Sequence, residues 1–292
     1  DHILLQKDIY GGTRNLVEAQ FDRYNIDYTF TDDINLKDFK SAIKKNTKVI
    51  YIETPSNPLL KIIDIVKIAE FAKSKNIITI IDNTFATPII QKPILFGVDI
   101  VLHSATKYFG GHSDFSAGAV AASQAHIDKI WNLAKNLGGN LSDYSVWLLE
   151  RSMKTLSIRV KAQQKNANKL AKYLSKSSFI KKVYYPGLKS HPNHILAKKQ
   201  MKGYGAMISF EFIDKIDPSL FLTSLNLIKP SMSLAGVEST MLSPAETSHY
   251  LLTENERLSQ GITNELIRFS VGIENKKDII MDIEHAIKLA LK

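Results

Sequence analysis

The sequence predicts an α/β protein whose mostly parallel sheet is covered by helices on both faces. Short apolar runs recur at residues 48–53, 77–82, 98–104 and 117–123, with the length and the branched side chains of buried strands. The run at residues 62–74 instead places its apolar side chains at helical spacing. Strand, helix and strand in this order form βαβ units, and such units build a parallel sheet between layers of helices.

The second half of the chain predicts a smaller α+β domain. Residues 142–175 are rich in helix formers and contain no Gly or Pro, so we expect one or two helices that lead into this domain. Residues 207–213 and 265–274 alternate apolar and polar side chains, as half-buried strands do. We therefore expect a large ligand-binding domain at residues 1–150 and a small domain at residues 151–292.

The composition is that of an ordinary folded protein with a basic surface. Of its 292 residues, 44% are hydrophobic and 23% are charged, and the formal net charge is +9. The lack of cysteine excludes disulfides, thiolate metal sites and a cysteine nucleophile in this chain. The lysines are scattered and are not interleaved with aromatic residues, which disfavours a basic nucleic-acid-binding module. No apolar stretch reaches the ~20 residues of a membrane span, so we expect neither nucleic acid nor membrane as a partner.

Two charged residues follow predicted strands closely. Asp82 ends the apolar run at 77–82, and Lys107 comes shortly after the run at 98–104. Ligands of open α/β sheets bind beyond the carboxyl ends of the strands, and a buried charge is unfavourable unless an opposite charge meets it. A ligand that meets both charges would explain both residues. The alternative is that Asp82 caps a turn and that Lys107 lies on the surface.

Pyridoxal 5'-phosphate (PLP) is a ligand that meets both charges. Its protonated pyridine nitrogen needs a carboxylate partner such as Asp82, and its aldehyde needs a lysine amine such as Lys107. Its phosphate needs hydroxyls and backbone N–H groups, which the segment 104–111 offers through Ser104, Thr106 and its two glycines. These residues predict a PLP site at this edge of the sheet.

A series of short motifs runs along nearly the whole chain: DIYGGT (8–13), IETPSNP (52–58), IDNTFATP (81–88), HSATKYFGGHSD (103–114), YYPGL (184–188), QMKGYGAMISFE (200–211), SLAGVES (233–239) and GITNELIRFSVGIE (261–274). Their collinear order resembles the Cys/Met-metabolism family of PLP enzymes, which includes cystathionine γ-synthase, cystathionine β-lyase, cystathionine γ-lyase and methionine γ-lyase. The resemblance implies the PLP-dependent transferase type I fold, with PLP bound in the large domain.

The resemblance implies a role for each cofactor residue. Lys107 resembles the lysine that holds PLP as a Schiff base and shuttles protons, and Asp82 resembles the partner of the pyridine nitrogen. Tyr10 resembles the tyrosine that stacks on the cofactor ring and acts in acid–base catalysis. Its alternative is a core tyrosine at a strand end. Ser104 and Thr106 resemble the ligands of the phosphate.

Three further residues resemble those around the substrate. Asn57 resembles the asparagine beside the cofactor's phenolic oxygen, where cofactor and substrate meet. Arg268 resembles the arginine that binds the substrate α-carboxylate through a bidentate fork. An arginine in an alternating strand, in a chain that uses lysine almost everywhere else, supports this role. Ser233 resembles the serine beside that carboxylate.

Two positions distinguish the reactions of the family. Methionine γ-lyases typically carry Cys where this chain has Gly12, and γ-synthases and γ-lyases commonly carry Glu where it has Met232. The resemblance therefore favours cystathionine β-lyase, a carbon–sulfur lyase that forms homocysteine, pyruvate and ammonia by β-elimination. Cystathionine γ-synthase and γ-lyase are the alternatives. The chain also departs from the family's commoner SLGG motif at Ala235.

Other motifs point to different kinds of site. Ser104 and Lys107 fit the S-x-x-K motif of penicillin-binding proteins, but the S-D-N and K-T-G elements of that class are absent from the sequence. His103, His112 and His249 invite a metal site, yet they lack helical H-x-x-x-H spacing and a carboxylate cluster. We therefore expect no metal.

The resemblance also bears on what surrounds this chain. In the family, a first phosphate-binding glycine turn and a Tyr-x-Arg segment that reaches into a neighbouring subunit lie upstream of DIYGGT. We therefore expect an N-terminal part of the large domain to be missing here. The resemblance further implies a cytoplasmic homo-oligomer, a tetramer built as a dimer of dimers, with a small amino acid as substrate.

Overall fold

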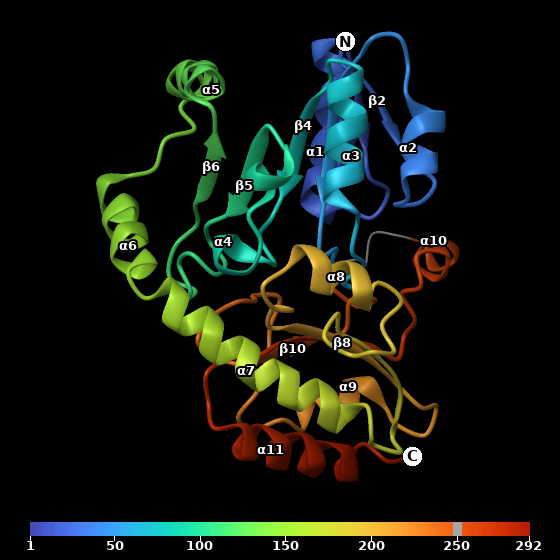
Figure 1. The fold of residues 1–292 in the computed structure, drawn as a ribbon. Coiled ribbons are helices and arrows are strands. Elements are labelled where there is room, and N and C mark those ends of the chain that lie inside the picture. Colours follow the sequence, from blue (N-terminus) through green and yellow to red (C-terminus); the bar gives the residue numbers. More distant parts are fainter. Residues whose placement is uncertain (248–252) are drawn as a thin grey trace.

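The computed structural model describes residues 1–247 and 253–292, which form two sheets (Figure 1). The first sheet is six-stranded, in the order β2-β1-β3-β4-β5-β6. Strands β1 to β5 are parallel, and β6 runs antiparallel to β5, so the predicted mostly parallel sheet is confirmed. The strands are β1 (His2–Leu5), β2 (Asp27–Phe30), β3 (Thr47–Glu53), β4 (Ile78–Asp82), β5 (Ile100–Ser104) and β6 (Gly118–Ala122).

One strand of this sheet is less buried than predicted. The run at 117–123 forms β6, but its side chains are half-buried or exposed. β6 lies at an edge of the sheet and consists of small residues, so it gains less cover than a central strand. The prediction of a buried strand at this place is therefore wrong, although the strand itself is present.

Helices cover both faces of the first sheet. Ile50 and Ile52 of β3 pack in one cluster with Ile68 of α3. Tyr51 of the same strand points to the other face and packs with Val17 of α1. The helices of this half are α1 (Gly11–Gln20), η1 (Phe21–Tyr24), α2 (Leu36–Ala42), α3 (Ile65–Ser74), α4 (Thr87–Ile90), η2 (Pro93–Phe96), α5 (Gln124–Leu137) and α6 (Asp143–Met153).

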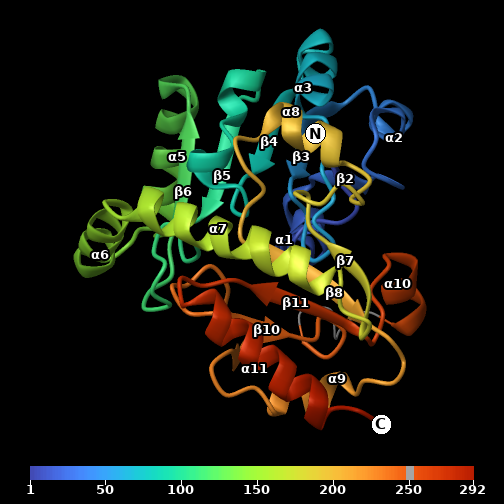
Figure 2. The ribbon, with the colours of Figure 1, turned by 60° about the horizontal axis from the view of Figure 1, so that its bottom comes forward.

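The predicted helices are present with shifted ends. α3 begins at Ile65 rather than at residue 62, because the Asp64 carboxylate caps it by accepting a hydrogen bond from the Lys67 N–H (3.2 Å). Residues 142–175 form two helices, α6 and α7 (Leu156–Leu174). Figures 1 and 2 show that α7 passes along the second sheet and reaches the first half of the molecule at its N-terminal end.

In the part of the chain that the structure describes, the second sheet is five-stranded, in the order β7-β8-β11-β10-β9. Its strands are β7 (Ile180–Tyr184), β8 (Met207–Phe212), β9 (Lys229–Pro230), β10 (Thr240–Leu242) and β11 (Leu266–Ser270). All neighbours pair antiparallel except β9 and β10. Besides α7, the helices of this half are α8 (His194–Gln200), α9 (Pro218–Thr223), α10 (Glu254–Ser259) and α11 (Lys276–Leu289).

The strands β8 and β11 are fully buried, not half-buried as their alternating pattern predicts. Two of their polar side chains, Ser209 and Arg268, contact the first half of the molecule instead of water. Ser209 donates a hydrogen bond to the Pro58 carbonyl (2.7 Å), and Arg268 reaches Asn57. An alternating strand can thus be covered on both faces when its polar face meets another polar surface.

One hydrophobic core joins the two halves. Leu60 and Tyr108 from the first half belong to the same buried cluster as Phe210 and Phe269 from the second. The six strands of the first sheet lie before residue 150 and the five of the second lie after it. The division into domains at 1–150 and 151–292 stays a prediction. In the described ranges, no helix is long and apolar enough to cross a bilayer.

Candidate active site

The carboxyl ends of three parallel strands border a cavity of about 400 Å³. Glu53, Asp82 and Ser104 end β3, β4 and β5. The eight residues to which the family resemblance assigned a role at PLP or the substrate all line this cavity, although their individual roles stay predictions. The lining residues are Tyr10, Glu53, Pro55, Asn57, Asp82, Thr84, Phe85, Ser104, Thr106, Lys107, Ser116, Met232, Ser233, Leu234 and Arg268.

Lys107 lies in the turn that follows β5. Its backbone N–H donates to the Ser104 carbonyl (3.1 Å), and its carbonyl accepts a hydrogen bond from the Gly111 N–H (2.7 Å). Burial, together with the positive charge of Arg268, lowers the pKa of the Lys107 amine. A lower pKa increases the neutral fraction of the amine, which is the form that attacks an aldehyde or accepts a proton.

Two carboxyl groups face the cavity from paired positions on adjacent strands, Glu53 and Asp82. Asp82 accepts a hydrogen bond from the Thr84 N–H, and Glu53 accepts one from the Tyr10 N–H, both at 2.8 Å. Burial raises the pKa of each carboxyl, and the charge of Asp82 raises the pKa of Glu53 further. Neither forms an ion pair within the described residues. A cation bound in the cavity next to Asp82 would therefore stabilise the ionised form of its carboxyl.

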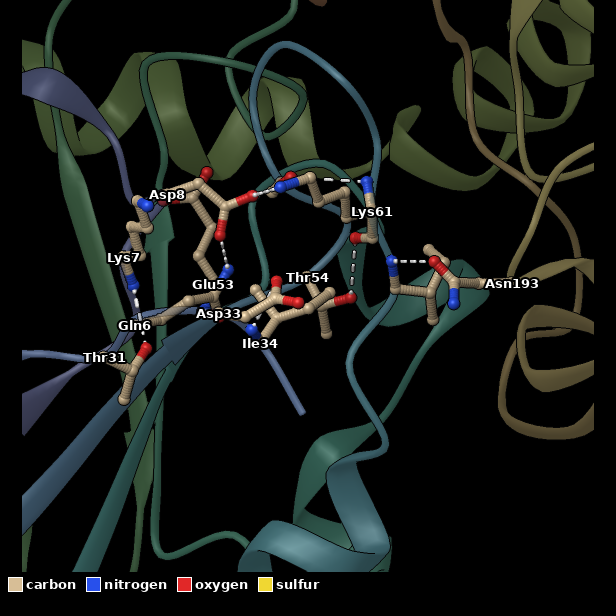
Figure 3. A network of polar contacts seen from close by, with 12 residues as sticks. Gln6, Lys7, Asp8, Thr31, Asp33, Ile34, Glu53, Thr54, Lys61 and Asn193 are labelled. Atoms are coloured by element: carbon tan, nitrogen blue, oxygen red, sulfur yellow. Dashed lines mark hydrogen bonds and ion pairs between the residues drawn. The ribbon is translucent and has the colours of Figure 1, made fainter. Parts of the chain in front are cut away.

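A polar network links Glu53 of β3 to Gln6 and Asp8, which lie shortly before Tyr10 in the chain (Figure 3). The Glu53 N–H donates to Gln6 Oε1 (2.9 Å), and Gln6 Nε2 donates to Asp8 (3.0 Å). Asp8 also forms an ion pair with Lys61 (3.2 Å). Since Tyr10 follows Asp8 by two residues, these bonds restrict where its backbone lies.

Arg268 is buried, with 4% of its surface exposed, and has no carboxylate partner among the described residues. It donates to the Met232 carbonyl (2.9 Å) and more weakly to Asn57 Oδ1 (3.4 Å). Burial lowers the pKa of Arg268 to about 10. A guanidinium without a counter-charge at a cavity wall is suited to bind a ligand carboxylate. Ser233 follows Met232 directly, and its Oγ lies 3.2 Å from that of Ser113.

The residues predicted to bind the phosphate differ in whether they already have hydrogen-bond partners. The Thr106 hydroxyl already accepts from the Ala117 N–H (2.9 Å) and donates to the Ala117 carbonyl (3.2 Å). Ser104 lines the cavity with its backbone N–H bound to Thr84 Oγ1 (2.8 Å). The glycine pair that follows is not part of the lining. A Cβ on Gly111 would overlap the Arg159 guanidinium, so the structure gives this glycine a packing role in place of the predicted phosphate contact.

Tyr10 directly precedes α1 and is 55% exposed, so the alternative of a core tyrosine is wrong. Gly12 makes room for its ring, because a Cβ on Gly12 would lie 2.5 Å from Tyr10 Cε1. Any side chain at position 12 would therefore require the tyrosine ring to move. Gly12 and Tyr10 together shape this wall of the cavity.

Sequence reasoning missed Glu53, Thr84 and Ser116 as lining residues. Glu53 ends an apolar run in the same way as Asp82, so its signal was present in the sequence. Thr84 binds both Asp82 and the Ser104 backbone, but a threonine in a turn is too common to be noticed alone. Ser116 carried no signal.

The histidines do not gather at a metal site in the part of the chain that the structure describes. His103 stacks on Phe109 with 4.7 Å between ring centroids, and burial lowers its pKa to about 4. His112 lies with Nδ1 2.8 Å from the Gly110 carbonyl oxygen. His249 lies outside the described residues.

The groups that line the cavity match the chemical needs of PLP. A protonated ring nitrogen would satisfy the buried Asp82 carboxylate, and the Lys107 amine is available to an aldehyde. Ser104 and Ser116 line the same space. Arg268 remains for the carboxylate of an amino acid. The fold and this set of groups together define a PLP-dependent enzyme of amino-acid metabolism.

Comparison with known proteins identifies the family. A model described as Cys/Met metabolism PLP-dependent enzyme matches residues 1–288, so the chain belongs to this family and PLP is its cofactor. A cystathionine β-lyase from Lactococcus lactis subsp. cremoris (strain MG1363) is 46% identical over 99% of this chain and 76% of its own length. A cystathionine γ-lyase from Bacillus subtilis (strain 168) is 43% identical, with the same shares covered.

Solved structures agree with this assignment. A cystathionine γ-lyase from Lactobacillus plantarum, complexed with L-serine, matches with a TM-score of 0.96 and 43% identity. A cystathionine γ-synthase from Xanthomonas oryzae pv. oryzae, in complex with cystathionine, matches with a TM-score of 0.94 and 38% identity. Each match covers 99% of this chain and 76% of the other. The predicted type I fold and the predicted family are both confirmed.

Proposed function

We propose that this chain cleaves cystathionine by β-elimination and releases homocysteine, pyruvate and ammonia. The observation that carries the proposal is Met232, which lines the cavity where γ-synthases and γ-lyases commonly have Glu. Its carbonyl accepts a hydrogen bond from Arg268 (2.9 Å), so this residue lies beside the proposed carboxylate-binding group. A thioether offers no acidic partner to a distal amine of the substrate. The similarity to a cystathionine β-lyase supports the same reaction.

Each proposed residue has a role that its surroundings suit. When bound, PLP supplies an aldehyde that takes up the substrate amine and a ring that withdraws electrons from Cα. Asp82 would hold a positive charge at the ring nitrogen, with Thr84 orienting the carboxylate. Ser104 and Thr106 would hold the phosphate, and Asn57 the side of the ring next to Arg268. Tyr10 would stack on the ring.

Arg268 and Lys107 would handle the substrate. Arg268 orients its α-carboxylate, with Ser233 beside it. The Lys107 amine removes the proton from Cα, which is favoured by its lowered pKa. The Cβ–S bond then breaks and the sulfur leaves with the electron pair, protonated by Lys107 or by Tyr10. Both groups line the same cavity.

A γ-lyase is the second candidate, and the similarity to the Bacillus subtilis and Lactobacillus plantarum γ-lyases supports it. A cystathionine γ-synthase stays a further alternative. Methionine γ-lyase is disfavoured because those enzymes typically carry Cys where this chain has Gly12, which leaves room for the ring of Tyr10.

The products formed from cystathionine decide among these reactions. We expect pyruvate and homocysteine, since β-elimination breaks the bond between sulfur and the three-carbon part. 2-Oxobutyrate and cysteine would show a γ-lyase instead. No cleavage, with cystathionine formed from an activated homoserine ester and cysteine, would show a γ-synthase. Lys107→Ala is the control, because loss of the acid–base group should lower turnover by at least ~10²-fold.

We further propose that the chain works in a cytoplasmic homotetramer and that its halves act as a PLP-binding domain and a small domain. Exposed aromatic side chains on α5 and α6 support self-association, among them Trp131, Tyr144 and Trp147. Both helices stand at the edge of the molecule beyond β6 (Figure 1). A second copy placed there would cover the exposed strand as well.

A further inference from the structure

One face of α7 carries polar side chains that point into the molecule. Arg159, Gln163 and Asn166 are spaced four and three residues apart, which places them on the same side of a helix. Arg159 is 5% exposed and Gln163 is fully buried. Polar groups are unfavourable inside a protein unless hydrogen bonds compensate for the lost water. The partners of these side chains therefore show what the helix face does.

Arg159 binds the segment that directly follows Lys107. Its Nη1 donates to the Tyr108 carbonyl (2.7 Å), and its Nη2 donates to the Phe109 carbonyl (3.2 Å). The guanidinium occupies the space that a side chain at residue 111 would need, and Gly111 has a positive φ of 72° there. No carboxylate pairs with Arg159 in the described part of the chain, and its guanidinium donates to three backbone carbonyls and to the Thr155 hydroxyl.

Gln163 binds the segment that follows Ser233. Its Nε2 donates to the Gly236 carbonyl at 2.6 Å. Its Oε1 is buried and has no hydrogen-bond partner within the described residues. The bond to Gly236 is thus the contact that compensates for burying this amide.

Asn166 binds the segment that follows Arg268. Its Nδ2 donates to the carbonyls of Gly272 (3.2 Å) and Glu274 (2.8 Å), just beyond β11. The three segments also bind one another. The Val237 N–H donates to the Gly111 carbonyl (3.0 Å), and the Ile273 N–H donates to the Val237 carbonyl (2.9 Å).

We propose that Arg159, Gln163 and Asn166 are positioning residues that set Lys107, Ser233 and Arg268 relative to one another. These active-site residues are far apart in the sequence, yet each is followed within a few residues by a carbonyl bound to α7. A rigid helix that holds all three segments fixes the cofactor-binding lysine against the groups that bind the substrate carboxylate. The inference rests on the proposed roles of those residues.

Binding of two probes tests the proposal without relying on turnover. PLP added to the apoprotein reports on Lys107. Glycine added to the holoenzyme reports on Ser233 and Arg268, since it has an α-carboxylate but no leaving group, and it is followed by the shift of the cofactor's visible band. These readouts do not depend on which carbon–sulfur bond is cleaved, so they remain valid if the proposed reaction is wrong.

The variants should separate into two classes. Gln163→Met keeps the side-chain volume and removes the donor, and Asn166→Ala removes the other amide. Each should weaken glycine binding by about three- to tenfold, the effect of losing one buried hydrogen bond, while PLP affinity stays near that of the wild type. Arg159→Lys keeps the positive charge but loses the planar guanidinium that donates to the Tyr108 and Phe109 carbonyls together. It should instead weaken PLP binding and borohydride-trapped labelling of Lys107.

Asn168→Ala is the matched control, because Asn168 is on the same helix and its side chain makes no hydrogen bond to the described residues. It should leave both affinities unchanged. Thermal unfolding of each variant separates folding from positioning. The proposal is overturned if Gln163→Met and Asn166→Ala unfold at lower temperature but bind glycine as the wild type does, or if Arg159→Lys binds PLP unchanged.

Discussion

At the scale of single residues, the paired carboxyls Glu53 and Asp82 are the most unusual feature of the site. Two buried acids on neighbouring strands cannot both ionise without strong repulsion, and burial raises the pKa of each. The protonated pyridine nitrogen of PLP would supply one positive charge, which would stabilise ionised Asp82. We therefore expect Glu53 to stay protonated, with its oxygen still accepting the hydrogen bond from Tyr10.

The difference in unfolding free energy between the Glu53→Gln apoprotein and the wild-type apoprotein should shift in favour of the variant as pH rises above 4.5. The folded pKa of Glu53 lies well above its usual value of 4.5, so above that pH the unfolded chain releases a proton that the folded chain keeps. Wild-type stability then falls with rising pH, by about 1.4 kcal/mol for each unit of pKa difference, until the folded group ionises. Glutamine has no ionisable proton, but its amide oxygen can still accept the hydrogen bond from the Tyr10 N–H. Urea unfolding at a series of pH values measures the effect, and a pH-independent difference would contradict it.

At the scale of elements, the segment 233–239 shows how a substrate-binding loop differs from the family motif. Ala235 is fully buried and has a φ of 68°, a left-handed conformation in which a Cβ is unfavourable. Its N–H donates to Ser270 Oγ (2.7 Å), which holds the loop against β11. The commoner glycine of the SLGG motif would adopt this conformation without strain. The surrounding bonds therefore impose the conformation on Ala235.

Ala235→Gly should stabilise the protein by about 1 kcal/mol, because relief of the left-handed strain exceeds the added flexibility of the unfolded chain. Ala206→Gly is the matched control. Ala206 is equally buried but has no positive φ, so the same change should destabilise by about 0.5–1 kcal/mol there. Denaturant midpoints of the two variants compare them directly. Destabilisation by both changes would mean that Ala235 is not strained.

The strands β8 and β11 show a limit of pattern reading at the same scale. Their alternation correctly predicts strands, but it cannot tell whether the polar face meets water or another part of the protein. Ser209 and Arg268 meet Pro58 and Asn57, residues more than a hundred positions away in the chain. Only the folded arrangement reveals that partner.

At the scale of the whole molecule, α5 and α6 both carry exposed aromatic side chains, and both helices stand beyond the edge strand β6 (Figure 1). Tyr144 stacks on Trp147 with 6.1 Å between ring centroids, which adds to an apolar surface that a monomer would leave in water. A tetramer that buries this face would explain it.

The double variant Trp131→Glu, Trp147→Glu should therefore form smaller assemblies than the wild type, since burying a carboxylate in an apolar interface is unfavourable. Sedimentation at matched concentrations measures the change. Ile195→Glu is the control, because Ile195 is exposed on α8, which lies away from α5 and α6 (Figure 1). An unchanged assembly in the double variant would place the interface elsewhere.

The sequence by itself predicted four of the six strands of the first sheet, its mostly parallel pairing, and the position of Asp82 and Lys107 at one edge of it. These follow from local patterns: apolar runs of strand length, helical spacing, and the charged residues Asp82 and Lys107 beyond strand ends. Because parallel strands end at one edge, such residues must meet there. The resemblance to the family extended this reasoning to Arg268 and Ser233.

Only the tertiary structure decided which distant segments meet and how they are held. The burial of both faces of β8 and β11, the strain at Ala235, the second acid at the cavity and the bonds from α7 all join parts of the chain that are remote in sequence. Local patterns report what each segment prefers. The partner that satisfies a buried polar group is chosen by packing of the whole chain, because long-range contacts alone determine where that group comes to lie.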